Sequence, residues 1–312
     1  MFRAVLNWIM KIAICPLVSH DIWRAKRCIV SCHLQLEHAS ISHSLVVHIN
    51  SLDESFADEM VSFCEDGGYR YLKSVSDGTP STGKNAILDF LAQSLFDGAC
   101  LVDGDDFLYP VSFMQIANHL HQFGETDLLV NHAMDCVVRS EFADPSMHPV
   151  VGDGVSAIVW GSNNWKMPSI YGTGPNPITQ PSVPQWPISL GRHQYYSKRL
   201  AKALKFDPRI VVGEDVMLEF EALHLHQVGE LVFFMTFGSD MYVFDRTLNN
   251  NIEKKHADQK HEYFRLIQQK LQKYDQERLD PRELPCCFPK IAYSYSDKIE
   301  FIQGLYKELA IT

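Results

Sequence analysis

Three aspartates stand at the end of an apolar segment, residues 100–107 (CLVDGDDF). The apolar residues before them are typical of a buried strand, so Asp103, Asp105 and Asp106 are predicted to lie where that strand ends. Carboxylates this close repel one another unless a cation lies among them. A site with only oxygen ligands favours Mg²⁺ or Mn²⁺ over zinc. Aspartate and glycine are also common turn residues, so the segment alone fits a polar turn equally well.

Strands and helices are predicted to alternate ahead of this segment. Short apolar runs at 12–18, 44–50 and 69–75 predict strands, and the strand that ends at Asp103 would be the fourth. Apolar residues at helical spacing predict a helix after each of the first three strands, the first over 21–37. This alternation favours an α/β fold with a mostly parallel central sheet and flanking helices.

The residues at the ends of these runs are expected to lie close together, because parallel strands end at the same edge of the sheet. Ligands of such folds bind at that edge. Besides the aspartates, the edge would carry Pro16, Asn50, Ser51, Asp53 and Asp77. This convergence is stronger support for a ligand site than any one motif.

The second half of the chain is less regular. A fourth helix, a strand near 127–138, a strand pair within 230–245 and an amphipathic helix over 256–275 are predicted. Residues 193–204 (HQYYSKRLAKAL) favour a basic helix or turn.

A long segment, residues 141–190, is rich in Pro, Gly, Ser and Asn and contains three tryptophans. A loop of this length inside a compact domain is usually functional or disordered, and the tryptophans argue against disorder. It is either a packed irregular segment or a lid that binds an acceptor through exposed aromatic side chains such as Trp165 and Trp186.

The composition is that of an ordinary soluble globular protein, with 312 residues of which 46% are hydrophobic and 21% charged. The net charge of −10 argues against a broad, non-specific nucleic-acid surface. None of the eight cysteines forms a CxxC pair, which favours reduced thiols and a cytoplasmic protein. Lys11 interrupts the apolar N-terminal segment, which is too short to span a bilayer and lacks the cleavage site of a signal peptide.

Four features, in this order, resemble the GT-A glycosyltransferases, and among them the family 2 type. They are STGKNAILDF with Lys84 and Asn85, VDGDD with the aspartates, GED with Glu214 and Asp215, and YVFDR with Arg246. The resemblance covers about residues 11–250 and implies a nucleotide-binding half over 11–110 and an acceptor half over 111–250. Residues 251–312 would form a C-terminal helical extension packed on this domain.

The resemblance also implies a reaction, the transfer of a sugar from a nucleotide-diphosphate donor to an acceptor hydroxyl. Mn²⁺ or Mg²⁺ bound by Asp105, with Asp103 or Asp106, would neutralise the leaving diphosphate. Asp215, or less favourably Glu214, would be the general base, and a single base without a covalent nucleophile implies inversion at the sugar. The donor would contact Lys84, Asn85, Asp103, Arg246 and the residues at the strand ends.

The sequence departs from the pattern of the resembled enzymes at two places. Asn50 and Ser51 stand where paired aspartates often bind the nucleotide. Lys84 stands where arginine is common, so a phosphate would be bound by the point charge of an ammonium group instead of by a bidentate guanidinium. A third metal ligand from the C-terminal half would be a histidine, and three candidates are present, His224, His226 and His256.

Other functions stay open on the sequence alone. A GDD turn also occurs in polymerases, although the short acidic chain counts against one. A non-catalytic module that binds nucleotide sugars or glycans could share the fold. The acceptor would be a glycan or, less favourably, a hydroxylated base in DNA bound by the basic run Arg192, Lys198, Arg199, Lys202 and Lys205.

Overall fold

The central sheet of the computed structural model has eight strands in the order β13-β11-β6-β10-β4-β1-β2-β3. The structure describes residues 9–131, 135–139, 148–151, 155–158, 192–236, 241–245, 247, 257–271, 286–287 and 294–309. The strands are β1 (Met10–Val18), β2 (Ile41–Ser51), β3 (Arg70–Val75), β4 (Gly98–Asp103), β6 (Leu128–Asn131), β10 (Arg192–Ser197), β11 (Phe233–Thr236) and β13 (Cys286–Cys287). Strand β10 pairs antiparallel with β4 and β6, and the other pairs in this sheet are parallel. The predicted mostly parallel sheet is confirmed.

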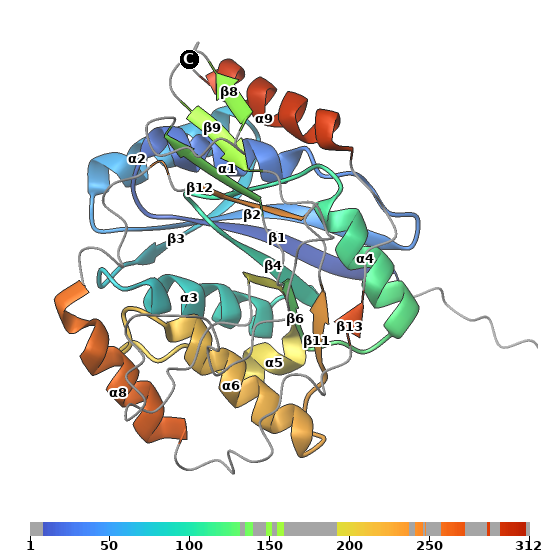
Figure 1. Cartoon of the computed structure of the whole chain (residues 1–312), viewed down its shortest axis with the longest axis vertical. Helices are drawn as coiled ribbons and strands as arrows, with labels where there is room; N and C mark the ends of the chain where they lie inside the picture. Colours follow the sequence, from blue (N-terminus) through green and yellow to red (C-terminus); the bar gives the residue numbers. More distant parts are fainter. Residues whose placement is uncertain are drawn as a thin grey trace, which may run out of the picture.

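Helices cover both faces of this sheet because its strands are apolar on both sides. Ile12 and Ile14 of β1 face α1 (Ile22–His33) and α4 (Ser112–Phe123), and α2 (Glu54–Asp66) packs on β2. Ala13 and Cys15 point the other way, toward α3 (Pro80–Gln93), α5 (Lys198–Ala203) and α6 (Glu214–Gln227). Helix α8 (Lys260–Leu271), which follows a 3₁₀ turn at Ala257–Gln259, packs outside this second layer (Figure 1).

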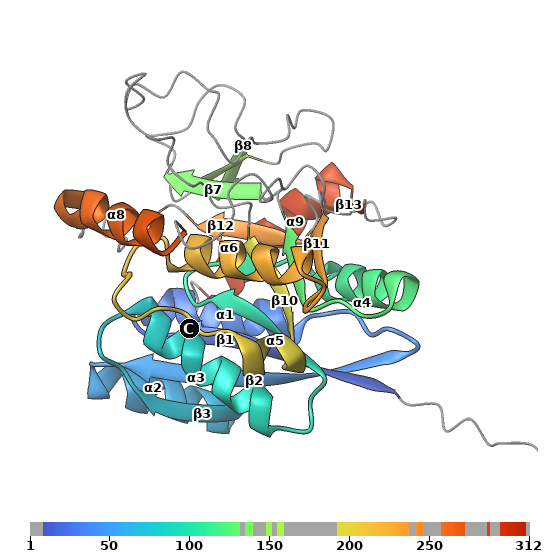
Figure 2. The same ribbon diagram turned by 90° about the horizontal axis from the view of Figure 1, so that it is seen from below.

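A second sheet of five strands lies beyond α1, in the order β5-β12-β7-β9-β8. Its strands are β5 (Phe107–Leu108), β12 (Tyr242–Asp245), β7 (Asp135–Arg139), β9 (Val155–Ile158) and β8 (His148–Val151). Helix α9 (Tyr295–Leu309) packs on this sheet and on α1 through Ile302, Leu305 and Tyr306. Figure 2 shows β7 and β8 well apart from β1, β2 and β3. Strand β5 directly follows the aspartate motif, so the motif joins the two sheets.

Three predicted elements differ from the observed ones. Residues 193–197 are a strand and not a helix, because Tyr195 and Tyr196 are buried on opposite faces of the central sheet. The strand predicted near 127–138 is two strands, β6 and β7, which belong to different sheets. The strands predicted to pair within 230–245 are β11 and β12, which also lie in different sheets.

Two expectations about the whole chain can be compared with the described residues. Within them, Cys15, Cys28, Cys32, Cys64 and Cys100 are free thiols buried in the core. In the same part of the chain, no helix combines the length and the apolar character that crossing a membrane requires.

Two buried histidines couple stability to pH. Exposed fractions are 2% for His48 on β2 and 6% for His119 on α4. Burial lowers the pKa of each imidazole to about 4, because the charged form loses its hydration. The unfolded chain takes up these protons near pH 6.5, so their contribution to stability is complete above that pH and is lost as the pH falls toward 4.

We predict that His48→Gln flattens the pH dependence of stability. Between pH 7 and pH 5 the free energy of unfolding of the wild type should fall further than that of the variant, by on the order of 1–2 kcal/mol. Urea titrations followed by circular dichroism at both pH values measure the difference. Equal changes in the two proteins would contradict the assignment to His48.

Candidate active site

The aspartate motif forms a tight turn at the carboxyl end of β4. The amide of Asp106 donates a hydrogen bond to the carbonyl of Asp103 at 2.9 Å, which closes the turn. Gly104 lies against the end of β1, where a Cβ atom would stand 2.4 Å from the carbonyl oxygen of Leu17. Only glycine allows this approach, so the turn is fixed against the neighbouring strand.

Asp106 points into the protein and is fully buried. Its Oδ2 accepts a hydrogen bond from the Tyr242 hydroxyl at 2.7 Å, and its Oδ1 accepts one from the Asp245 amide at 2.9 Å. Burial and the Asp105 carboxylate raise the pKa of Asp106 well above its ordinary value. The carboxyl group of Asp106 therefore fastens β12 to the motif, and its role as a metal ligand stays a prediction.

The carboxylate of Asp103 forms ion pairs with two cationic side chains. Its Oδ2 lies 2.7 Å from Nη1 of Arg192, and its Oδ1 lies 3.9 Å from Nζ of Lys84. Burial would raise the pKa of Asp103, but the positive charges of Lys84 and Arg192 hold it below its ordinary value. Asp103 is thus an ionised carboxylate with both oxygens engaged.

Arg192 reaches the motif because β10 runs antiparallel to β4, so the first residue of β10 lies beside the last residue of β4. Its guanidinium carbon lies 4.3 Å from the centre of the Phe244 ring and 5.6 Å from that of Tyr242. In the sequence, Arg192 is distinguished only as part of a basic run. Its position beside the aspartate motif depends on the antiparallel pairing of β10 with β4, which the sequence pattern does not predict.

Lys84 and Glu214 form a buried ion pair, with 2.7 Å between Nζ and Oε1. Burial alone would lower the pKa of Lys84, but the carboxylates of Asp103, Glu214 and Asp215 raise it. Glu214 begins α6 and is 6% exposed, so its carboxylate is engaged by Lys84, and its role as a general base stays a prediction. Asp215 is half-buried, and its Oδ1 accepts a hydrogen bond from the amide of Val216 at 2.9 Å.

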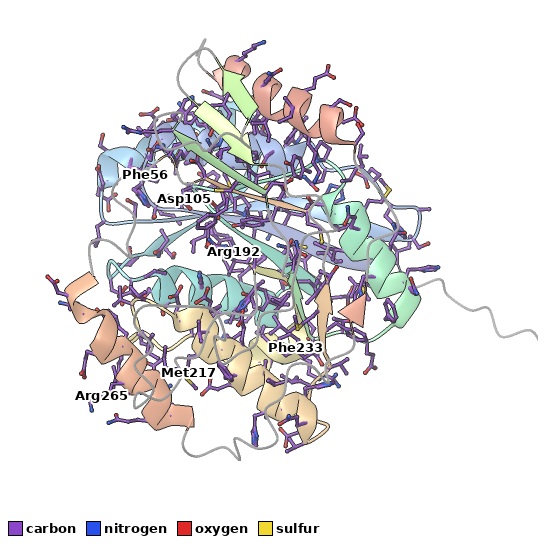
Figure 3. All side chains as sticks on the ribbon, in the orientation of Figure 1. Phe56, Asp105, Arg192, Met217, Phe233 and Arg265 are labelled. Atoms are coloured by element: carbon purple, nitrogen blue, oxygen red, sulfur yellow. The ribbon has the colours of Figure 1, made fainter. Side chains whose placement is uncertain are left out.

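The carboxylate of Asp105 makes no hydrogen bond or ion pair with another described residue, whereas the main-chain carbonyl of Asp105 accepts a hydrogen bond from Arg27. Burial and the Asp103 carboxylate raise its pKa, a sign that positive charge is short there. The described residues of the site provide five carboxyl groups, Asp103, Asp105, Asp106, Glu214 and Asp215, and two cations, Lys84 and Arg192. Figure 3 shows Asp105 and Arg192 in the middle of the view, between α1 and α3.

The donor set at the motif suits a divalent cation in part. Asp105 offers a free, partly buried carboxylate, and Asp103 stands beside it, so oxygen ligands and a deficit of positive charge coincide. Among the described residues, no three His, Cys, Asp or Glu side chains come together as one metal site. The residues present therefore fit a metal held by one or two carboxylates, with its other positions filled by a ligand.

A buried arginine supports the motif from behind. Arg27 of α1 donates to the carbonyl of Asp105 at 2.6 Å through Nη2, and its Nη1 lies 2.5 Å from Oδ2 of Asp245. Tyr306 of α9 accepts a hydrogen bond from Arg27 at 2.8 Å and donates to Asp245 at 3.1 Å. Burial would raise the pKa of Asp245, but Arg27 holds it below its ordinary value. This network joins residues far apart in the chain, so no local pattern in the sequence predicts it.

Several residues predicted to contact a donor are bonded within the protein. The side-chain amide of Asn50 donates a hydrogen bond to the Ser74 hydroxyl at 2.8 Å, and the Ser51 hydroxyl donates one to the main-chain carbonyl of Ser19 at 2.6 Å. Asp53 caps the start of α2 through the amides of Ser55 and Phe56, and Asp77 accepts from Thr79 at 2.8 Å in a turn. Their side chains shape the edge of the sheet.

Two further residues predicted at this edge, Pro16 and Asn85, are held within the fold. Pro16 lies inside β1, opposite Val102, because Leu17 and Val18 continue the strand. Asn85 bonds both ends of its amide to the backbone of Phe206, each at 2.8 Å, so it anchors the segment before α6 rather than facing a ligand.

Other predicted residues lie elsewhere. Arg246, Trp165, Trp186 and His256 fall outside the described residues. Nδ1 of His226, near the end of α6, lies 3.2 Å from both the carbonyl oxygen of Leu231 and the amide nitrogen of Phe233. In the basic run, Arg199 pairs with Asp127 and Glu125, and Lys205 pairs with Asp89 at 2.8 Å. These pairs reduce the positive charge that a DNA acceptor would need.

We predict that Tyr306→Phe lowers the free energy of unfolding by about 1–3 kcal/mol, because the lost hydroxyl bonds two buried charged groups. The matched control is Tyr71→Phe, which removes a hydroxyl that donates to Glu65 at the surface and should destabilise the protein far less. Urea unfolding of the three proteins measures both effects. Equal costs for the two substitutions would show that the buried network adds nothing.

Solved structures provide the comparison with known proteins, since no protein-family model and no curated protein sequence matches the chain. The structure of Staphylococcus aureus TarS matches with a TM-score of 0.51 and 16% identity over 85% of this chain, which spans 40% of that one. TarS 1-349 in complex with UDP-GlcNAc gives a TM-score of 0.52 and 16% identity, over 85% of this chain and 67% of that one. TarS 1-349 alone gives 0.50 and 14%, over 97% and 72%. The chain therefore has the fold of TarS, and the GT-A-like glycosyltransferase fold predicted from its sequence is confirmed.

Proposed function

We propose that the protein is a metal-dependent, inverting glycosyltransferase that moves a sugar from a nucleotide-diphosphate sugar to an acceptor hydroxyl, with a glycan as the acceptor. The observation that carries this proposal is the carboxylate of Asp105, which is paired with no other described residue and lies at the carboxyl end of a central strand in a GT-A-like fold. Ligands of α/β sheets bind at this edge.

The metal is assigned to Asp105, with Asp103 as the second carboxylate. When bound, Mn²⁺ or Mg²⁺ supplies a Lewis acid that neutralises charge on the leaving diphosphate. Asp106 has no part in this assignment, because both of its oxygens are bonded to β12.

The cations of the chain itself complete the donor site. Arg192 and Lys84 border Asp103, at 2.7 and 3.9 Å, and stabilise negative charge near the motif. Arg192 is one-fifth exposed, whereas Lys84 is held by Glu214, so Arg192 is the better placed of the two to reach a phosphate. Arg246 is assigned to the donor by resemblance alone.

Asp215 is proposed as the general base that accepts the proton of the attacking hydroxyl. It is half-buried at the start of α6, and its charge raises the pKa values of both Lys84 and Arg192, which indicates that it lies on the same site. Lys84 neutralises the adjacent Glu214, so Asp215 is the carboxylate of the pair that stays available. With one base and no covalent nucleophile, the sugar would be transferred with inversion.

We predict that uridine nucleotides raise the melting temperature in the presence of Mn²⁺. UDP and UDP-GlcNAc are the first probes because TarS has been crystallised with UDP-GlcNAc, and GDP and CDP serve as comparisons. A ligand at about 100 times its Kd adds about 2.7 kcal/mol to the stability of the folded state. No Mn²⁺-dependent shift with any nucleoside diphosphate would contradict the proposal.

Asp105→Asn tests whether the shift depends on the motif. This variant should lose the Mn²⁺-dependent shift. Asp89→Asn, which removes a surface carboxylate paired with Lys205, should keep it. A full shift in Asp105→Asn would remove the metal from the aspartate motif.

We predict that Asp215→Asn keeps the nucleotide-induced shift but lowers sugar transfer by about 10²- to 10⁴-fold, which is the usual contribution of a general base. Release of UDP from UDP-GlcNAc in the presence of a glycan acceptor measures transfer. Loss of the thermal shift in this variant would instead assign Asp215 to donor binding.

A further inference from the structure

Arg192 spans the aspartate motif. Nη1 of its guanidinium lies 2.7 Å from Oδ2 of Asp103, and Nη2 lies 3.4 Å from Oδ2 of Asp106. The other oxygen of Asp103 faces Lys84. A divalent cation therefore gains a ligand from Asp103 only if one of these cations gives way.

Lys84 is the less movable of the two cations. Its side chain is 8% exposed, and its Nζ lies 2.7 Å from Glu214 but 3.9 Å from Asp103. Moving it would leave Glu214 buried without a partner, which is costly. Arg192 has a side chain 20% exposed and makes its closest contact with Asp103 itself.

Aromatic rings hold the guanidinium in this position. Phe244 lies at 4.3 Å and Tyr242 at 5.6 Å from its central carbon, and both rings belong to β12. Stacking of this kind keeps an arginine oriented while its N–H groups stay able to change partners. Figure 3 shows Arg192 near Asp105, the carboxylate assigned to the metal.

We propose that Arg192 is a positioning residue that holds the motif closed against a free divalent cation and makes metal binding conditional on an anionic nucleotide. Without nucleotide, Arg192 occupies Asp103 and repels a second cation. A diphosphate offers the guanidinium new oxygen partners, so Asp103 becomes free for the metal. The identity of the anion rests on the proposed function, but the competition between Arg192 and the metal does not.

This arrangement has a thermodynamic consequence. If nucleotide relieves the competition, it raises the affinity for the metal, and by linkage the metal raises the affinity for the nucleotide by the same factor. Removing the guanidinium should therefore strengthen binding of the metal alone and weaken the coupling between the two ligands.

Isothermal titration calorimetry with MnCl₂ alone tests whether Arg192 competes with the metal. We expect Arg192→Gln to bind Mn²⁺ about tenfold more tightly than the wild type, or more, because a nearby positive charge and a competing ligand are both removed. The matched control is Arg209→Gln, which removes an arginine paired with Asp207 at the surface and should bind Mn²⁺ like the wild type. Equal or weaker Mn²⁺ binding by folded Arg192→Gln would overturn the proposal.

Arg192→Lys is a second variant that tests the same competition, for use if Arg192→Gln does not fold. Lysine keeps the charge but cannot bridge Asp103 and Asp106, so its affinity for Mn²⁺ should lie severalfold above that of the wild type. Melting temperatures establish that each variant is folded. A lysine variant with the affinity of the wild type would also overturn the proposal.

The titrations are then repeated with saturating UDP, with a blank for the Mn²⁺–UDP complex in solution. UDP should raise the Mn²⁺ affinity of the wild type about tenfold or more and that of Arg192→Gln by a smaller factor. If the Mn²⁺ affinities differ as expected but neither protein binds UDP, GDP or CDP, the competition between Arg192 and the metal stands and the proposed function fails. If UDP and Mn²⁺ bind but the two proteins show the same coupling, the inference fails and the proposed function stands.

Discussion

A shortage of positive charge at the carboxyl end of β4 is the constraint on which the rest of the site depends. Asp105 has no partner there among the described residues, and burial would be unfavourable for its charge in the absence of a cation. Two protein cations, Lys84 and Arg192, offset part of the negative charge. The remaining deficit is what a divalent cation would supply, so the same imbalance that limits stability creates the capacity to bind a ligand.

Two arginines contact the aspartate motif, one at its main chain and one at a side chain. Arg27 binds the carbonyl of Asp105 and is fully buried, so it fixes the path of the main chain. Arg192 binds the side chain of Asp103 and is partly exposed, so it remains able to exchange partners. Rigid support of the backbone together with an exchangeable side-chain contact is the arrangement that a preorganised binding site requires.

Much of the fold could be predicted from the sequence because apolar runs at 12–18 and 44–50 specify buried strands locally. The position of the aspartate motif followed from the same pattern. The direction of Asp106 and the role of Arg192 could not be predicted, because they depend on β12 and β10, which join the motif from more than 80 positions along the chain. The basic helix or turn predicted over 193–204 was wrong for residues 193–197 for the same reason, since burial between β4 and β6 makes them a strand, whereas Lys198–Ala203 do form a helix, α5.

The contact between Arg27 and Tyr306 joins residues that are 279 positions apart. During synthesis the nascent chain must therefore wait for the codons of α9 before the support of the aspartate motif is complete. At about 5–20 residues per second, that delay is roughly 15–60 s. By the time Asp245 has been made, seven of the eight strands of the central sheet are present, and Arg27 and Asp245 then lack Tyr306 for a further 61 residues. The growing polypeptide thus passes through a period in which most of the sheet has been made while the support of the aspartate motif is still incomplete.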